Sequence, residues 1–321
     1  MNEYETFYNM VKKWTVSDYR TQKIKAEVIV DTLISDYIEN IVSQNLGKTI
    51  KLIAKEFPIA RIGQPLIEKM GDKSPNRQYA SVDFLMSAKE FDKPIIYLVE
   101  LKTSDDSADD LQFLNMLWTC SQGSGSLYNR FYDIIMNYGI KDNGNDLSTK
   151  KYLYTLSKFA VNNNLEKFED GIKSFGVERL GMANCPVKKE QTKTASDILN
   201  ALKTLFDNAN LKIVYVGLNN KINFVNMVKS AFNKQSIKEK IAKDNAVKKF
   251  FEVYGASGEI KEDFCKRINL KNIEKIRLTD FKPSKAKEKE WELVKKILDE
   301  LDEEPLGKEW FDAKKLIDAL D

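Results

Sequence analysis

The chain of 321 residues is long enough for a main domain and an appended part, and its 42% hydrophobic and 31% charged residues are typical of a soluble globular protein. It contains no histidine, which excludes a Ser-His-Asp triad, a histidine general base and a histidine-ligated zinc site. No apolar run reaches the roughly 18 residues of a membrane span, and the polar N-terminus does not resemble a signal peptide. Three widely spaced cysteines, Cys120, Cys185 and Cys265, argue against a disulfide framework and favour a reducing cytoplasmic location.

Charge is distributed unevenly along the chain, although the net charge is only +3. Residues 211–290 carry 19 Lys and Arg against 10 Asp and Glu, whereas residues 291–321 carry 5 against 10. A basic segment of this kind is typical of a protein that binds a polyanion. A solvated, lysine-rich helical surface has the same composition, so charge alone leaves both interpretations open.

The first hundred residues predict one helix followed by three strands. Residues 17–46 have apolar positions at helical spacing and end at Gly47, which predicts a single long helix. Residues 49–54 alternate in polarity, and residues 79–86 form a second strand candidate after a turn-rich loop. The third strand contains Ile-Ile-Tyr-Leu-Val at residues 95–99, and apolarity on both faces is typical of a central strand covered by helices.

The rest of the sequence adds one strand and many helices. Residues 107–120 predict a helix, and residues 127–210 are mostly helical with loops between them. Residues 211–217 predict a fourth strand, and only helical patterns follow from about residue 222. An α/β fold is therefore expected. We expect a first domain over residues 1–221, with a helical insertion at about 123–192. A helical C-terminal domain over residues 222–321, basic and then acidic, would complete the chain.

Three charged residues in the second and third predicted strands are candidates for a functional site. Asp83 lies in the second strand, and Glu100 and Lys102 end the third. Side chains alternate along a strand, so Glu100 and Lys102 share a face, about 6 to 7 Å apart along the backbone. The pattern acid-x-Lys occurs four times in this sequence, but only this copy closes an apolar strand. The simpler alternative is a surface ion pair at a strand end.

In these strand contexts, Asp83, Glu100 and Lys102 resemble the motif of the PD-(D/E)XK nuclease superfamily. One departure is Val82, which occupies the position of the motif's proline. The resemblance covers roughly residues 17–122 and 193–217. It implies a restriction-endonuclease-like αβββαβ core with a mixed central sheet, formed by helix 17–46, strands near 49–56, 79–86 and 95–102, helix 107–120 or 195–207, and strand 211–217.

The resemblance also implies a chemistry that needs no histidine. Asp83, Glu100 and the backbone carbonyl of Leu101 would bind Mg²⁺, or Mn²⁺, because hard cations prefer oxygen ligands. Lys102 would orient the attacking water and stabilise the anionic transition state. The expected activity is metal-dependent hydrolysis of phosphodiester bonds, with DNA as the partner and no membrane association.

Other residues complete the expected site. Nucleases of this type often take a third carboxylate from the first helix. Glu27 lies on the apolar stripe of that helix and is favoured over Glu39, whose neighbours indicate solvent; Glu56 is the fallback. Gln112, on the helix after the third strand, is a candidate substrate contact, because some RecB-like nucleases have a glutamine there. The alternative function is a catalytically inactive module of the same fold that binds nucleic acid or a protein partner.

Overall fold

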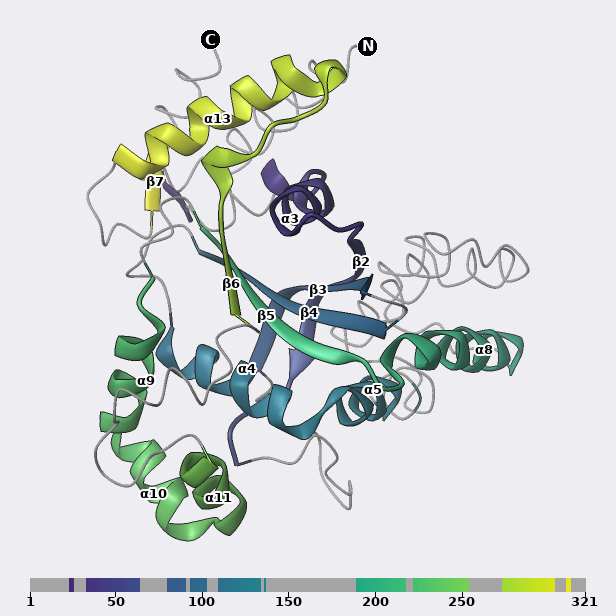
Figure 1. Cartoon of the computed structure of the whole chain (residues 1–321), viewed down its shortest axis with the longest axis vertical. Helices are drawn as coiled ribbons and strands as arrows, with labels where there is room; N and C mark the ends of the chain where they lie inside the picture. The colour runs from purple at the N-terminus through teal and green to yellow at the C-terminus, as the bar shows by residue number, and fades with distance from the viewer. Residues whose placement is uncertain are drawn as a thin grey trace.

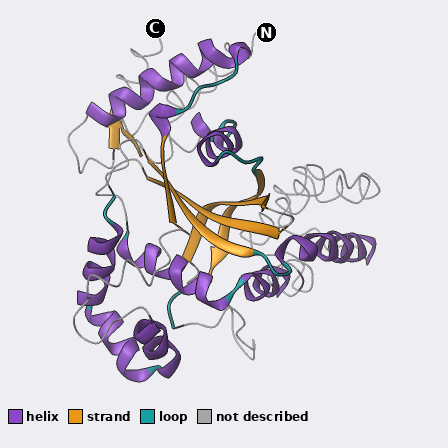
Figure 2. Cartoon of the chain, viewed as in Figure 1, coloured by secondary structure: helices purple, strands orange, loops and turns teal. Residues whose placement is uncertain are grey.

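A computed structural model describes residues 23–25, 33–63, 80–90, 93–102, 109–133, 136, 189–217, 222–253, 273–303 and 310–312 of the chain. Its centre is a five-stranded mixed sheet (Figures 1 and 2). In spatial order the strands are β2 (Lys51–Ile59), β3 (Ala80–Glu90), β4 (Lys93–Lys102), β5 (Asn210–Gly217) and β6 (Ile273–Arg277).

The directions of the strands decide which residues meet at each end of the sheet. β2, β3 and β4 are antiparallel neighbours, whereas β4, β5 and β6 run parallel. The carboxyl ends of β4, β5 and β6 therefore lie at the same end of the sheet. In the register, Lys102 is paired with Gly217, and Gly217 is paired with Arg277.

Helices cover both faces of the sheet, as Figure 1 shows. Side chains of six helices join the hydrophobic cluster on the first face. These helices are α4 (Asp110–Gln122), α5 (Ser124–Asp133), α8 (Lys189–Phe206), α9 (Phe224–Asn233), α10 (Gln235–Lys243) and α11 (Asn245–Val253). The second face is covered by α3 (Ile38–Leu46) and α13 (Glu288–Glu303), where Tyr37, Phe281 and Trp291 pack together. The α/β class expected from the sequence is confirmed.

The apolar run of β4 shows why this strand lies in the middle. Ile96 and Leu98 are fully buried in the first cluster, while Tyr97 and Val99 are buried in the second. Burial of one large apolar side chain stabilises the fold by about 1.5 to 3 kcal/mol, so both faces of this strand hold it in the core. Glu100 and Lys102 continue the face of Ile96 and Leu98, as the alternation predicted.

The expected helix over residues 17–46 is wrong in part. Lys23–Lys25 form strand β1, which pairs antiparallel with β7 (Trp310–Asp312). Helix α3 begins only at Ile38, after a turn at residues 35–37. Ser35 and Asp36 lie in this turn, and their side chains favour turns because they compete for backbone hydrogen bonds.

The expectation of purely helical structure after residue 222 is also wrong, because β6 extends the sheet beyond β5. Ile273 and Ile276 are three residues apart, a helical spacing, yet they are buried on opposite faces of the sheet. The domain boundary at residue 221 stays a prediction. Of the expected insertion at 123–192, the structure describes Gly123, α5, Met136 and the start of α8, and the rest lies outside the described residues. Within the described ranges, every helix is too short or too polar to cross a lipid bilayer.

Candidate functional site

A buried ion pair occupies the carboxyl end of β4. The Lys102 Nζ lies 2.7 Å from Glu100 Oε1, and the two residues are only 5% and 1% exposed. Removing two charges from water costs several kcal/mol, and the mutual attraction offsets this cost only when further hydrogen bonds complete the pair. The sequence prediction that these two side chains share a face is confirmed, but the pair is buried rather than on the surface.

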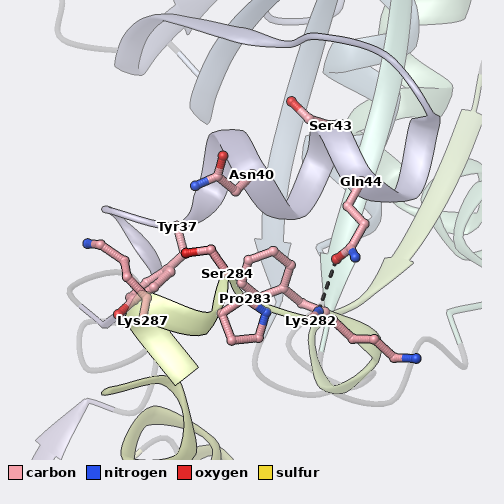
Figure 3. Close-up of a pocket in the computed structure, with 9 residues that line it drawn as sticks. Tyr37, Asn40, Ser43, Gln44, Lys282, Pro283, Ser284 and Lys287 are labelled. Atoms are coloured by element: carbon pink, nitrogen blue, oxygen red, sulfur yellow. Dashed lines mark hydrogen bonds between the residues drawn. The ribbon is translucent and has the colours of Figure 1, made fainter. Parts of the chain in front are cut away.

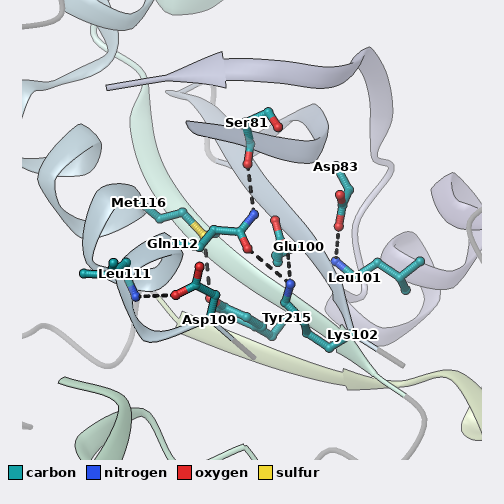
Figure 4. A network of polar contacts seen from close by, with 10 residues as sticks. All are labelled: Ser81, Asp83, Glu100, Leu101, Lys102, Asp109, Leu111, Gln112, Met116 and Tyr215. Carbon is teal, nitrogen blue, oxygen red and sulfur yellow. Dashed lines mark hydrogen bonds and ion pairs between the residues drawn. The ribbon is translucent and has the colours of Figure 1, made fainter. Parts of the chain in front are cut away.

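Gln112 supplies one of these further hydrogen bonds from α4 (Figure 4). Lys102 Nζ donates to Gln112 Oε1 at 3.2 Å, and Gln112 Nε2 donates to the Ser81 carbonyl at 3.0 Å. The side chain thus links β3, β4 and α4. Its place is fixed by the start of the helix, where Asp109 accepts a hydrogen bond from the Leu111 N–H as an N-cap.

Asp83 lies where β3 and β4 separate. Backbone pairing between these strands ends at Phe84 and Val99, although β4 continues to Lys102 beside β5. The Leu101 N–H therefore has no β3 backbone partner and donates to Asp83 Oδ2 at 2.6 Å. The N–H and C=O of an extended residue point to the same edge of a strand, so the Leu101 carbonyl also faces the edge where Asp83 lies.

An irregularity in β2 and β3 accompanies this separation. Val82 is buried in the first cluster but Phe84 in the second, so side-chain alternation breaks at Asp83. In β2 the same break occurs at Glu56, which lies opposite Asp83 in the register and has a φ of 46°. A positive φ is uncommon for a residue with a Cβ and stores strain, often next to functional sites. Glu56, the remaining candidate for the third carboxylate, therefore lies on β2 opposite Asp83 on β3.

A buried tyrosine that the sequence did not indicate lies beside the candidate site. Tyr215 on β5 is paired in register with Glu100, and its hydroxyl contacts Met116 Sδ at 3.7 Å. Burial is the largest cause that raises the pKa of Tyr215 well above its usual value of 10, and the charges of Glu100, Asp109 and Asp83 raise this pKa further. Three carboxylates therefore act on one buried phenol. Only the register between β4 and β5 could have identified Tyr215 as a neighbour of Glu100.

The donor groups suit a hard cation, although the set is small. Asp83, Glu100 and the Leu101 carbonyl offer oxygen ligands at neighbouring positions of β3 and β4. Mg²⁺ often uses one or two carboxylates, with water and substrate phosphates as its other ligands. In the part of the chain that the structure describes, no three acidic, cysteine or histidine side chains gather closely enough to hold a metal ion.

The candidates for a third carboxylate have different outcomes. Glu27 lies outside the described residues, so its assignment stays a prediction. Glu39 does not point into solvent as expected, because its Oε1 accepts a hydrogen bond from the Leu52 N–H at the beginning of β2. That end of β2 lies opposite the end of the sheet that carries Lys102, so Glu39 does not belong to this site.

A separate pocket of about 540 Å³ lies on the other face of the sheet, between α3 and the segment from Phe281 to Lys287 (Figure 3). The Lys282 N–H donates to Gln44 Oε1 at 3.0 Å across one side of it. Lys287 extends over the Tyr37 ring, with 5.1 Å between Nζ and the ring centroid. None of the residues at the end of β4 lines this pocket.

Comparison of the chain with protein-family models, curated proteins and solved structures found no match.

Proposed function

We propose that this chain is a metal-dependent nuclease of the PD-(D/E)XK type that hydrolyses phosphodiester bonds of DNA. The observation that carries the proposal is the grouping of Glu100, Lys102 and Asp83 where β3 and β4 separate. The order α3, β2, β3, β4, α4, β5 agrees with the αβββαβ core of that superfamily, including its mixed strand directions.

Asp83 and Glu100, with the Leu101 carbonyl, would hold Mg²⁺ or Mn²⁺. When bound, such an ion lowers the pKa of a water ligand and neutralises charge on the phosphate. The hydrogen bond from the Leu101 N–H fixes the Asp83 carboxylate at the strand edge. Glu100 is fixed in the same way by Lys102, so both ligands are positioned before substrate arrives.

Lys102 supplies the positive charge that the reaction needs. Its ammonium orients the attacking water and donates to the phosphate oxygens as negative charge develops in the transition state. Gln112 holds the ammonium through its Oε1, and its own amide is fixed by the Ser81 carbonyl. Gln112 therefore acts first as a positioning residue for Lys102, and a direct contact with substrate is the second role proposed for it.

The experiment is a cleavage assay on supercoiled plasmid with Mg²⁺ or Mn²⁺, with EDTA as the metal-free control. Asp83→Asn keeps an acceptor for the Leu101 N–H but removes a charge, and Glu100→Gln does the same beside Lys102. The matched control is Asp280→Asn, because Asp280 belongs to another acid-x-Lys copy and is exposed. We expect cleavage by the wild type and by Asp280→Asn, and a loss of at least about 100-fold in the two site variants. Unchanged cleavage in Glu100→Gln would remove the proposal.

A second candidate is a catalytically inactive module of the same fold that binds nucleic acid or a protein. The specific observation in its favour is that Glu100 is ion-paired with Lys102 inside the protein, so each charge already has an opposite charge beside it without a metal ion. Cation-linked stabilisation distinguishes the two functions. A nuclease is stabilised by millimolar Mn²⁺ through Asp83 and Glu100, whereas the inactive module melts at the same temperature with and without the ion.

A further inference from the structure

Strand β6, which the sequence patterns did not predict, places a second cation beside the candidate site. Lys102 pairs with Gly217 on β5, and Gly217 pairs with Arg277 on β6. Side chains of directly paired residues project from the same face of a sheet, so Arg277 and Lys102 share a face. Gly217 has no side chain, so β5 places none of its own between them. Two strand spacings separate the two backbones by about 10 Å.

The two basic residues on this face of β6 have different surroundings. Lys275 Nζ donates to the Ile222 carbonyl and lies 4.9 Å from the centre of the Phe224 ring. Lys275 therefore has a structural role in attaching the start of α9 to the sheet. Arg277 ends the strand as an exposed residue, and no carboxylate among the described residues forms an ion pair with it. Its guanidinium is available to a ligand.

The chemistry of this position matches a phosphodiester backbone. A guanidinium presents planar, paired donors that bind two oxygens of one phosphate. Successive nucleotides of a duplex strand advance by about 3.4 Å along the helix axis and also wind around it, so about 10 Å spans at most about three nucleotide steps. Arg277 is thus placed to reach a phosphate a few nucleotides from the one that Lys102 would contact.

We infer that Arg277 is a backbone anchor that binds a phosphate of double-stranded DNA within about three nucleotides of the candidate cleavage position. The inference rests on the proposed function, because that function places the scissile phosphate at Lys102. It adds a substrate contact from a strand outside the αβββαβ core. The contact carries no base information, so it contributes affinity and register along the duplex rather than sequence preference.

The test measures binding of a fluorescent 20-base-pair duplex by anisotropy, in EDTA so that no cleavage occurs, over a range of salt concentrations. Arg277→Gln is compared with Lys249→Gln, which removes one positive charge from α11. Lys249 is a suitable control because it too is exposed and forms no ion pair with a described carboxylate. Arg277→Lys separates the need for charge from the need for the paired donors of a guanidinium.

We expect Arg277→Gln to lower affinity by about tenfold and to reduce the slope of log affinity against log salt by about 1. Arg277→Lys should keep the slope and lose only part of the affinity, and Lys249→Gln should bind as the wild type does. The inference is overturned if Arg277→Gln binds normally, if Lys249→Gln has an equal effect, or if the wild type binds no duplex.

This outcome can be told apart from a failure of the proposed function. A wild type that binds duplex through Arg277 but never cleaves it would support the anchor and remove the nuclease. Cleavage that depends on Glu100 but not on Arg277 would support the nuclease and remove the anchor. All variants are first compared by thermal melting, where the exposed positions predict melting temperatures close to that of the wild type.

Discussion

Two copies of the acid-x-Lys pattern lie in different environments in this molecule. Glu100 and Lys102 end a central strand, are almost fully buried, and form an ion pair. Asp280 and Lys282 repeat the acid-x-Lys pattern around a buried Phe281, but both are exposed at the end of a short 3-10 helix, Leu278–Asp280. Both members of this second copy belong to the described residues, and no ion pair joins their side chains.

The difference shows that the strand, rather than the pattern, creates the site. In β4 alternation places both charges on one face, beneath α4, where Gln112 completes the pair. At residues 280–282 the chain leaves the core, and Figure 3 shows Lys282 extending away from α3. Charge at the first location is costly unless it is matched, whereas charge at the second is stabilised by water.

The largest expected difference between the two copies is in stability. Lys102→Ala leaves Glu100 buried without its cation, and loss of one member of a buried pair costs about 3 to 5 kcal/mol. Lys282→Ala should change the free energy of unfolding by less than about 0.5 kcal/mol. Urea denaturation of both variants measures the contrast, and equal midpoints would contradict the burial of the pair.

A double variant sharpens this comparison. Glu100→Gln with Lys102→Met removes both charges and keeps side chains of similar size, so it should be more stable than Lys102→Ala. It should nevertheless lack nuclease activity. If the double variant is less stable than both Lys102→Ala and Glu100→Gln, the ion pair itself stabilises this end of β4, and not merely the avoidance of an unmatched charge.

The next effect is a dependence of stability on alkaline pH. Burial and nearby carboxylates raise the pKa of Tyr215 well above 10, whereas an unfolded tyrosine ionises near 10. Above pH 10 the unfolded state therefore loses a proton that the folded state retains, and stability falls by up to about 1.4 kcal/mol per pH unit for this residue. Tyr215→Phe should show a shallower decline between pH 10 and 11 in denaturation experiments, and an unaltered slope would contradict its placement.

A smaller effect is expected at Gln112. Gln112→Ala removes the acceptor for Lys102 and the donor to the Ser81 carbonyl, at a cost of about 1 kcal/mol in stability. Gln112→Glu keeps the acceptor and adds a negative charge beside Lys102. If Gln112 positions Lys102, cleavage by Gln112→Glu should exceed that by Gln112→Ala. Faster cleavage by Gln112→Ala than by Gln112→Glu would mean that Gln112 contacts the substrate and does not position Lys102.

Much of the core could be predicted because the relevant signals are local. The unbroken apolar run of β4 and the alternation at its end are sufficient to place Glu100 and Lys102 on one face. The short strands β1 and β6 could not be predicted. Ile24 lies between two lysines and pairs with a segment almost 290 residues away, and the two isoleucines of β6 have a helical spacing.

The arrangement around Asp83 could not be predicted either. Its contact with the Leu101 N–H exists because β3 and β4 stop pairing after Phe84 and Val99, and the irregularity at Glu56 accompanies that break. Tyr215 and Arg277 depend on the register of β5 and β6 against β4. Register between parallel strands far apart in sequence has no local signature, since the connections between them are long.

We propose that Asp83 and Glu100 bind one cation, and calorimetric titration with Mn²⁺ tests this most directly. The wild type and Asp280→Asn should bind one ion with the same affinity, and Asp83→Asn and Glu100→Gln should each lose at least about tenfold. No heat of binding in the wild type, or full affinity in both site variants, would contradict the account.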